Sequence, residues 1–309
     1  MIEAEHLTKR YGEKLAVDDL SFTIRPGIVT GFLGPNGSGK STTMRMIMGL
    51  DHPTAGWATV NGRHYHDLAW PLREVGALLE AKAIHPGRSA RGHLRMLAEA
   101  NRIPLRRVDE MLDLVGLASV AAQRAGKFSL GMSQRLGIAA ALLGDPGVLI
   151  LDEPVNGLDP DGIRWVRILL KGLAAEGRTV FVSSHLMSEM ALTADEVVVI
   201  GRGRFLAQQP VAEMTEQSTA RFVRVRSPQL EKLHAALEEQ QAQIALQDGA
   251  LIVRGMDKEA IGDLAASLPV TLHELAAESA SLEEAFMELT EQSIEYHGAL
   301  QGPARGADR

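Results

Sequence analysis

A glycine-rich run near the start of the chain has the residue types that hold phosphate. Residues 34–42, here called the phosphate loop, match G-x-x-x-x-G-K-[ST] at every fixed position. Glycines let backbone N–H groups turn inward around phosphate oxygens at the start of a helix. Lys40 would supply charge to the outer phosphates, and the Ser41 hydroxyl would bind Mg²⁺. The residues predicted to contact a nucleoside triphosphate are Gly34, Pro35, Asn36, Gly37, Ser38, Gly39, Lys40, Ser41 and Thr42.

Two adjacent carboxylates follow a short apolar run in the middle of the chain. Residues 148–151 read V-L-I-L and lead directly into Asp152 and Glu153. A buried strand that ends in acids beside a phosphate loop is how phosphate-transferring enzymes hold Mg²⁺ and a hydrolytic base. We therefore expect Asp152 to hold the metal through water and Glu153 to polarise the attacking water.

The segments around these motifs alternate between strand and helix patterns. Residues 28–33 form an apolar run typical of a buried strand, and residues 43–49 are typical of the helix that leaves the phosphate loop. Residues 148–151 and 180–182 indicate short, buried parallel strands with helical segments between them. This order predicts an α/β fold of the P-loop NTPase class.

The length of the chain allows one large and one small domain. Residues 1–214 are predicted to form the nucleotide-binding domain, with a β-rich start and a helical insertion over about residues 85–145. Residues 215–297 alternate as βαββαβ, which predicts a small α+β accessory domain of ferredoxin-like topology. Residues 298–309 are predicted to be a disordered tail.

Charge and composition argue against several classes of protein. The 309 residues carry a net charge of −7 and contain no cysteine, which fits a reducing compartment. Residues 216–309 hold 16 acidic and 8 basic side chains, so this part lacks the basic balance that binds nucleic acid. No apolar run is long enough to span a membrane, and the charged start lacks a signal core. We expect a cytoplasmic chain without a nucleic-acid partner.

Three further motifs resemble those of ABC transporter ATPases. Residues 128–135, F-S-L-G-M-S-Q-R, resemble the family's signature segment. Residues 156–159, N-G-L-D, resemble its D-loop, and residues 183–185, S-S-H, resemble the segment that ends in the switch histidine. Tyr11 resembles the aromatic residue that stacks on adenine. Together with the phosphate loop and the acidic strand, these motifs stand in the family's order and cover roughly residues 1–210.

The resemblance implies an ATP-hydrolysing subunit that works as a homodimer. In that family ATP is sandwiched between the phosphate loop of one subunit and the signature segment of the other. The resemblance assigns catalysis to Glu153 and His185. It assigns contacts with the partner's nucleotide to Ser129, Leu130, Gly131, Met132 and Asp159. It also implies a separate integral membrane permease, which would hold the chain at the inner face of the cell membrane.

Two features depart from the family's usual pattern, the signature segment and residue 80. Leu130 and Met132 replace a glycine and the glutamine of L-S-G-G-Q, and Glu80 stands where a glutamine usually senses Mg²⁺. A carboxylate can ligate Mg²⁺ directly, which adds Glu80 to the predicted metal ligands Ser41 and Asp152. Both departures resemble the bacitracin-exporter-like group of drug and antimicrobial-peptide ABC exporters, as does S-L-E-E-A-F at residues 281–286. We therefore expect drug or peptide export.

Two other functions were weighed against export. An ABC ATPase that acts on ribosomes or DNA would carry two cassettes, or a long coiled coil before the signature segment. This chain has one cassette and no basic patch. A small-molecule phosphotransferase would need a lid and an acceptor pocket, and would have no use for a signature segment or a D-loop. The motifs therefore favour the transport ATPase.

Overall fold

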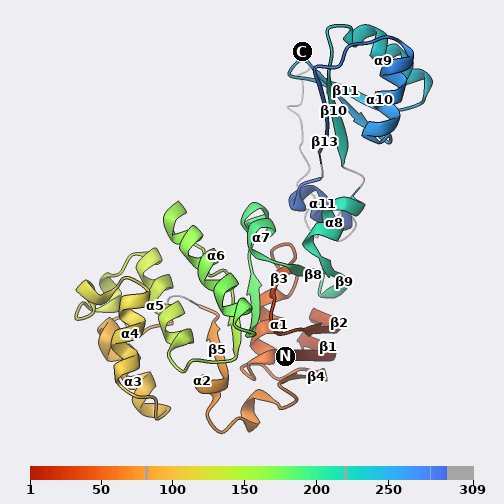
Figure 1. Ribbon diagram of the computed structural model, residues 1–309. Helices are drawn as coiled ribbons and strands as arrows, with labels where there is room; N and C mark the ends of the chain where they lie inside the picture. Colours follow the sequence, from red (N-terminus) through yellow and green to blue (C-terminus); the bar gives the residue numbers. More distant parts are fainter. Residues whose placement is uncertain (81–82, 219–220, 279, 291–309) are drawn as a thin grey trace, which may run out of the picture.

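The computed structural model describes residues 1–80, 83–218, 221–278 and 280–290 (Figure 1). The described strands are β1 (Ile2–Tyr11), β2 (Lys14–Ile24), β3 (Val29–Leu33), β4 (Ala55–Val60), β5 (Val75–Leu78), β6 (Val148–Leu151), β7 (Thr179–Ser183), β8 (Glu196–Gly201), β9 (Arg204–Pro210), β10 (Phe222–Arg226), β11 (Gln243–Gln247), β12 (Ala250–Arg254) and β13 (Glu274–Glu278). The described α-helices are α1 (Lys40–Ile47), α2 (Pro71–Glu74), α3 (Ala90–Ala100), α4 (Arg106–Leu114), α5 (Leu130–Leu142), α6 (Pro160–Ala175), α7 (Met187–Thr193), α8 (Val211–Gln217), α9 (Leu230–Glu239), α10 (Lys258–Ser267) and α11 (Leu282–Thr290). Residues 298–309, predicted to be a disordered tail, lie outside the described residues.

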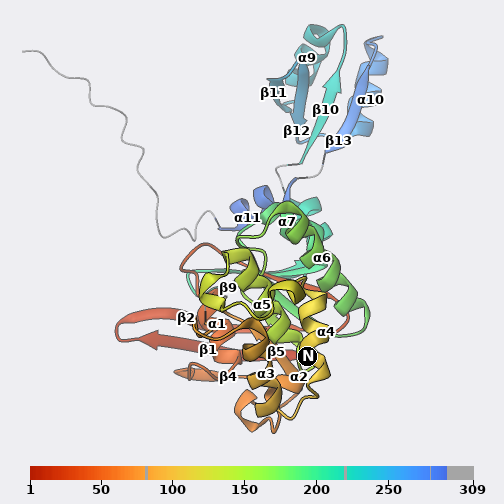
Figure 2. The same cartoon turned by 90° about the vertical axis from the view of Figure 1, so that its left-hand side faces the viewer.

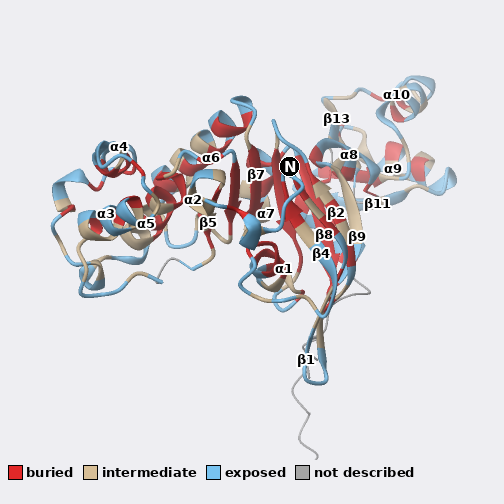
Figure 3. Cartoon of the chain, turned by 90° about the horizontal axis from the view of Figure 1, so that it is seen from below, coloured by how far each residue is buried: buried red, intermediate tan, exposed pale blue. Residues whose placement is uncertain are grey.

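The central sheet has six strands in the order β5-β6-β7-β3-β8-β9. Neighbouring strands are parallel except β9, which runs antiparallel to β8. Every residue of β3, β6, β7 and β8 is buried, because helices or the second sheet cover both faces. Figure 3 shows buried strands of this sheet in red at the middle of the molecule. The α/β fold predicted from the apolar runs is confirmed.

A second, antiparallel sheet of β2, β1 and β4 packs on the central sheet. Phe22 of β2 lies 5.8 Å, ring centroid to ring centroid, from both Phe32 of β3 and Phe181 of β7. Such tilted aromatic contacts bury large apolar area, and they anchor β2 to the two strands that lead into the candidate site. The β-rich part predicted for the start of the chain is therefore present.

The helical insertion is formed by α3, α4 and α5, which lie together at one side of the molecule in Figure 1. Leu94, Leu112 and Leu136 come from these three helices and are at most 1% exposed. All three belong to the same hydrophobic cluster as Leu78 and Leu151 of the central sheet. The insertion therefore packs directly against the strands that carry the acidic motif.

The third sheet has the order β11-β12-β10-β13, and its paired strands are antiparallel. With α9 and α10 this gives the ferredoxin-like topology predicted from the βαββαβ pattern. The last strand of this sheet, β13, begins only at Glu274. The Val270 N–H donates to the Ala265 carbonyl, so this apolar residue closes the end of α10 instead of joining the sheet.

Helix α11 packs against α7 and α8 and not on the third sheet (Figures 1 and 2). Ser281 and Glu284 form a capping box, in which each accepts a hydrogen bond from the other's backbone N–H. Phe286 is 6% exposed and lies in one cluster with Met190 and Met214. The last described helix therefore belongs to the core of the nucleotide-binding part, although a domain boundary at residue 215 places it with the accessory unit. None of the described helices is long and apolar enough to cross a membrane.

Candidate nucleotide site

A cleft of about 410 Å³ opens where β3 leads through the phosphate loop into α1. The loop needs glycine at Gly39, which has a left-handed φ of 103° and where a Cβ atom would lie 2.6 Å from the Ala16 carbonyl oxygen. Gly34 and Pro35 belong to the phosphate loop but do not line the cleft. The cleft is lined by Tyr11, Lys14, Ala16, Asn36, Gly37, Ser38, Gly39, Lys40, Ser41, Thr42, Asp152 and Glu153.

Lys40 is the buried cation that the phosphate loop contributes to this cleft. Its side chain is 8% exposed, and Nζ donates to the carbonyl oxygens of Gly34 at 2.5 Å and Pro35 at 3.2 Å. Burial lowers the pKa of Lys40, and the nearby carboxylates of Glu153 and Asp152 oppose that shift. A partly desolvated ammonium at a helix N-terminus, inside a glycine-rich loop, fits a polyphosphate.

Asp152 is held by two hydroxyl groups from different elements. Ser41 Oγ of α1 donates to Asp152 Oδ2 at 2.6 Å, and Ser183 Oγ of β7 donates to Asp152 Oδ1. Ser183 is fully buried, and its Oγ also accepts from the Glu153 N–H at 3.0 Å. The acidic motif, the phosphate loop and the end of β7 are thus joined in one hydrogen-bonded cluster.

Glu153 has a constrained backbone and a paired carboxylate. Its φ of 51° lies in the left-handed region, which costs a non-glycine residue about 1–2 kcal/mol. The Glu153 carbonyl accepts from Gln134 Nε2 at 2.7 Å and from the Asn156 N–H at 3.1 Å. Its Oε2 lies 2.7 Å from His185 Nδ1 and accepts from the His185 N–H at 3.3 Å. A carboxylate positioned in this way can orient and deprotonate a water molecule.

Tyr11 stands at the rim of the cleft. Its hydroxyl donates to Asp51 Oδ2 at 3.0 Å, and Asp51 also accepts from Arg45 Nε at 2.7 Å. The Lys9 ammonium lies 5.0 Å from the centroid of the Tyr11 ring. Burial and the Asp51 carboxylate raise the pKa of Tyr11, so its hydroxyl stays neutral. Because the side chain is tied at its hydroxyl and 46% exposed, it can offer its ring to a flat ligand.

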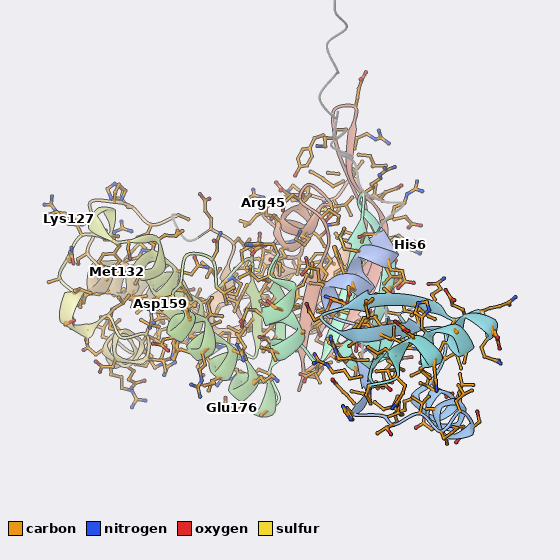
Figure 4. All side chains as sticks on the ribbon, turned by 90° about the horizontal axis from the view of Figure 1, so that it is seen from above. His6, Arg45, Lys127, Met132, Asp159 and Glu176 are labelled. Carbon is orange, nitrogen blue, oxygen red and sulfur yellow. The ribbon has the colours of Figure 1, made fainter. Side chains whose placement is uncertain are left out.

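Ser129 of the signature segment and Asp159 of the D-loop each cap a helix. Ser129 caps α5, where its Oγ accepts from the Met132 N–H at 3.2 Å, and Asp159 caps α6 by accepting from the Gly162 N–H at 2.9 Å. Neither residue lines the cleft. Figure 4 shows Met132 and Asp159 on the side of α5 and α6, apart from Arg45 of α1.

The atypical Leu130 packs on the D-loop of its own chain. A Cβ atom on Gly157 would lie 2.4 Å from Leu130 Cδ2, and one on Gly131 would lie 2.9 Å from the Gly157 carbonyl oxygen. Gly157 also has a left-handed φ of 75°. Leu130, which replaces a glycine of the usual signature, therefore fits because the D-loop residue that it contacts, Gly157, has no side chain.

Glu80 faces the acidic motif from the other side. It lines a hollow of about 230 Å³ together with Leu130, Asp152 and Glu153. Glu80, Asp152 and Glu153 therefore line one hollow, although no three acidic or histidine side chains of the described residues lie close enough together to hold a metal ion by themselves. Their negative charges are unfavourable for an anion that binds without a cation.

Two supporting residues have roles that the sequence reasoning did not assign. Ser183 is the last residue of β7, a buried strand that pairs in parallel with β6, so its position at the same sheet edge as Asp152 is the signal that could have found it. Gln134 lies in the signature segment. No local pattern indicates that its amide reaches the Glu153 carbonyl, because that contact depends on how α5 packs against β5 and the end of β6.

Comparisons with known proteins agree with this geometry. The family described as ABC transporter matches residues 17–156, and a domain of unknown function matches residues 221–283. The uncharacterized ABC transporter ATP-binding protein YhcH of Bacillus subtilis (strain 168) is 36% identical over 96% of this chain and 97% of its own length. The bacitracin transport ATP-binding protein BcrA of Bacillus licheniformis is 41% identical over 71% of this chain and 72% of its own length. The chain belongs to the ABC transporter ATP-binding proteins.

A solved structure places the fold in the same class. The dimeric post-hydrolysis state of an ATP-binding cassette bound to ADP and Pi is 25% identical, with a TM-score of 0.63, over 68% of this chain and 98% of that one. The described fold is therefore that of an ABC ATPase, a class of enzyme that binds and hydrolyses ATP.

Proposed function

We propose that this chain is the ATP-hydrolysing subunit of a two-component ABC exporter that moves drugs or antimicrobial peptides. It acts at the inner, cytoplasmic face of the membrane on a separate permease. The observation that carries the proposal is that the residues predicted to contact ATP lie in two separate places on the chain. The phosphate loop and the acidic cluster share one cleft, whereas Ser129 and Asp159 lie outside it in the same chain. The relative BcrA, by its name, serves bacitracin transport.

Each chain in this proposal supplies two half-sites. The cleft around Lys40 holds the triphosphate, and Tyr11 stacks on the adenine. Ser129 and Gly131, at the N-terminus of α5, contact the γ-phosphate bound to the other copy, with Leu130 and Met132 beside them and Asp159 across the interface. ATP then joins two copies, and its hydrolysis releases them, which delivers work to the permease.

The residues beside the phosphate loop fit Mg²⁺. Ser41 Oγ and Asp152 Oδ2 lie 2.6 Å apart, and with Glu80 they offer the hard oxygen donors that this ion prefers. Bound with the nucleotide, Mg²⁺ would offset the negative charge of the phosphates and of the three carboxylates. Ser41, Asp152 and Glu80 are the residues that would hold it, directly or through water.

Glu153 is the base in this proposal. Its carboxylate takes a proton from the water that attacks the γ-phosphate, and ADP and phosphate leave as the bond to the β-phosphate oxygen breaks. His185 is bonded to the same carboxylate through Nδ1, so its ring is oriented beside the reacting group. When both of its ring nitrogens carry a proton, Nε2 can donate a hydrogen bond to the γ-phosphate.

Replacing Glu153 by glutamine tests the ATP-dependent dimer. Because the amide cannot accept the proton, ATP persists, and the full-length variant should become a dimer with ATP and Mg²⁺ in light scattering. Adding Ser129→Ala to Glu153→Gln removes the γ-phosphate contact and should shift the equilibrium back toward the monomer by about tenfold. A Glu153→Gln chain that binds ATP but stays monomeric at every concentration would refute the sandwich.

The permease is tested by finding a multi-span membrane protein encoded beside this gene and co-expressing it with this chain. We expect the two to purify together and the membrane protein to change the ATPase rate. Vesicles that contain both should transport a bacitracin-like peptide with ATP, and vesicles with Glu153→Gln should not. Transport that is equal with and without the ATPase subunit would contradict the proposal.

A further inference from the structure

Helix α5 supports both ends of the turn that carries the base. The turn runs from Glu153 to the D-loop, and the Asn156 N–H closes it by donating to the Glu153 carbonyl at 3.1 Å. At its start, Gln134 Nε2 of α5 donates to that same carbonyl at 2.7 Å. At its end, Leu130 of α5 packs on Gly157 so closely that a Cβ there would lie 2.4 Å from Leu130 Cδ2.

Gln134 is placed to control the backbone of Glu153. It is 3% exposed, and its amide provides one of two hydrogen bonds to the Glu153 carbonyl. The Glu153 N–H is held from the other side by Ser183 Oγ at 3.0 Å. These contacts surround a residue whose left-handed φ of 51° is unfavourable without support. A change in the position of Gln134 would therefore move the carboxylate.

The same helix begins at the residue predicted to meet the partner's nucleotide. Ser129 caps α5, and Gln134 follows five residues later, which is about 7.5 Å along the axis at 1.5 Å per residue. A hydrogen-bonded helix transmits a displacement of its first turn over this length with little loss. Ser129 and Glu153 serve different ATP molecules in the proposed dimer, so α5 connects the two sites within one chain.

We propose that Gln134 is a positioning residue that sets the geometry of Glu153 according to what binds at the Ser129 end of α5. The inference rests on the proposed two-site dimer. A γ-phosphate bound at Ser129 fixes the position of the first turn of α5. Gln134 then holds the Glu153 carbonyl in place, and the Glu153 carboxylate in the chain's own site becomes aligned. Hydrolysis at one site thus depends on occupancy of the other.

Gln134→Met in the full-length chain tests the positioning role. Methionine keeps the length and volume, and the Asn156 N–H still satisfies the Glu153 carbonyl, so the fold should persist. We expect kcat for ATP to fall about tenfold with KM within twofold of the wild-type value. Gln208→Met is the matched control, because Gln208 Nε2 makes an equal 2.7 Å bond to the Thr23 carbonyl, and it should leave kcat unchanged. A Gln134→Met kcat equal to that of Gln208→Met would overturn the inference.

A double-mutant cycle tests the connection to Ser129. If Ser129 acts on Glu153 through Gln134, Ser129→Ala should lower kcat at saturating ATP at least threefold more in the wild-type chain than in the Gln134→Met chain. If Ser129→Ala lowered kcat by the same factor in the wild-type chain and in the Gln134→Met chain, the connection would be overturned. Dimer formation by Glu153→Gln is measured separately, so an absent dimer refutes the proposed function, whereas a normal dimer with equal factors refutes only this inference.

Discussion

Ser183→Ala should show how much the buried hydroxyl at the end of β7 contributes to the fold and to the site. Ser183 Oγ donates to the Asp152 carboxylate, a type of bond worth about 1.5–3 kcal/mol, and accepts from the Glu153 N–H, worth about 0.5–1.5 kcal/mol. Losing both bonds should lower the free energy of unfolding by about 2–4 kcal/mol. At about 2–4 °C per kcal/mol, the midpoint of thermal unfolding should fall by about 5–15 °C. ATPase activity should fall about 10–100-fold, because Asp152 loses its orienting partner.

Ser184→Ala provides the matched control for this experiment. Ser184 is also buried, at 3% exposure, but its Oγ only accepts a 3.0 Å bond from the Leu186 N–H. Losing this bond should lower the free energy of unfolding by about 1 kcal/mol and the midpoint of thermal unfolding by about 2–4 °C. Most of the ATPase activity should remain. Differential scanning calorimetry and a steady-state phosphate-release assay measure both quantities. Equal shifts and equal activities in the two variants would refute the special role of Ser183.

Two further predictions concern α11 and Glu80. Phe286→Ala removes a side chain buried against the nucleotide-binding core and should lower the free energy of unfolding by about 3–5 kcal/mol. Met287 is 51% exposed, so Met287→Ala should change that free energy by no more than about 0.5 kcal/mol. Similar unfolding midpoints for the two variants would contradict this packing. Glu80→Gln removes one of the proposed Mg²⁺ ligands, which shares a hollow with Asp152 and Glu153, so ATP with Mg²⁺ should bind about threefold more weakly and turnover should change. Calorimetry and phosphate release that both match the wild type would argue against a special role for Glu80.

The sequence was sufficient for the parts of the site that lie within one local segment. The phosphate loop is continuous in the chain, so its glycines, Lys40 and Ser41 already form one unit in sequence. Asp152 could also be placed, because β3 and β6 are buried parallel strands and the carboxyl ends of such strands meet at one edge. The observed 2.6 Å contact between Ser41 Oγ and Asp152 Oδ2 follows from that rule.

The sequence could not place α11, whose amphipathic pattern fits any apolar surface. Its local signals were read correctly, since the capping box begins the helix at Leu282 as expected. Which surface receives Phe286 depends on where the chain returns after the third sheet. The structure places it against α7 and α8. Cutting the chain near residue 215 would therefore remove a core helix together with the accessory sheet.

By itself, the sequence determined that this chain binds a nucleoside triphosphate, that its core is α/β, and that it carries the motifs of an ABC ATPase. These features are encoded by short, contiguous patterns whose geometry is local. Only the tertiary structure decided that Gln134 reaches the Glu153 carbonyl, that Ser183 joins the two acids, and that Leu130 packs on Gly157. Each of these contacts joins residues that are distant in sequence, so it exists only after helices and strands have packed.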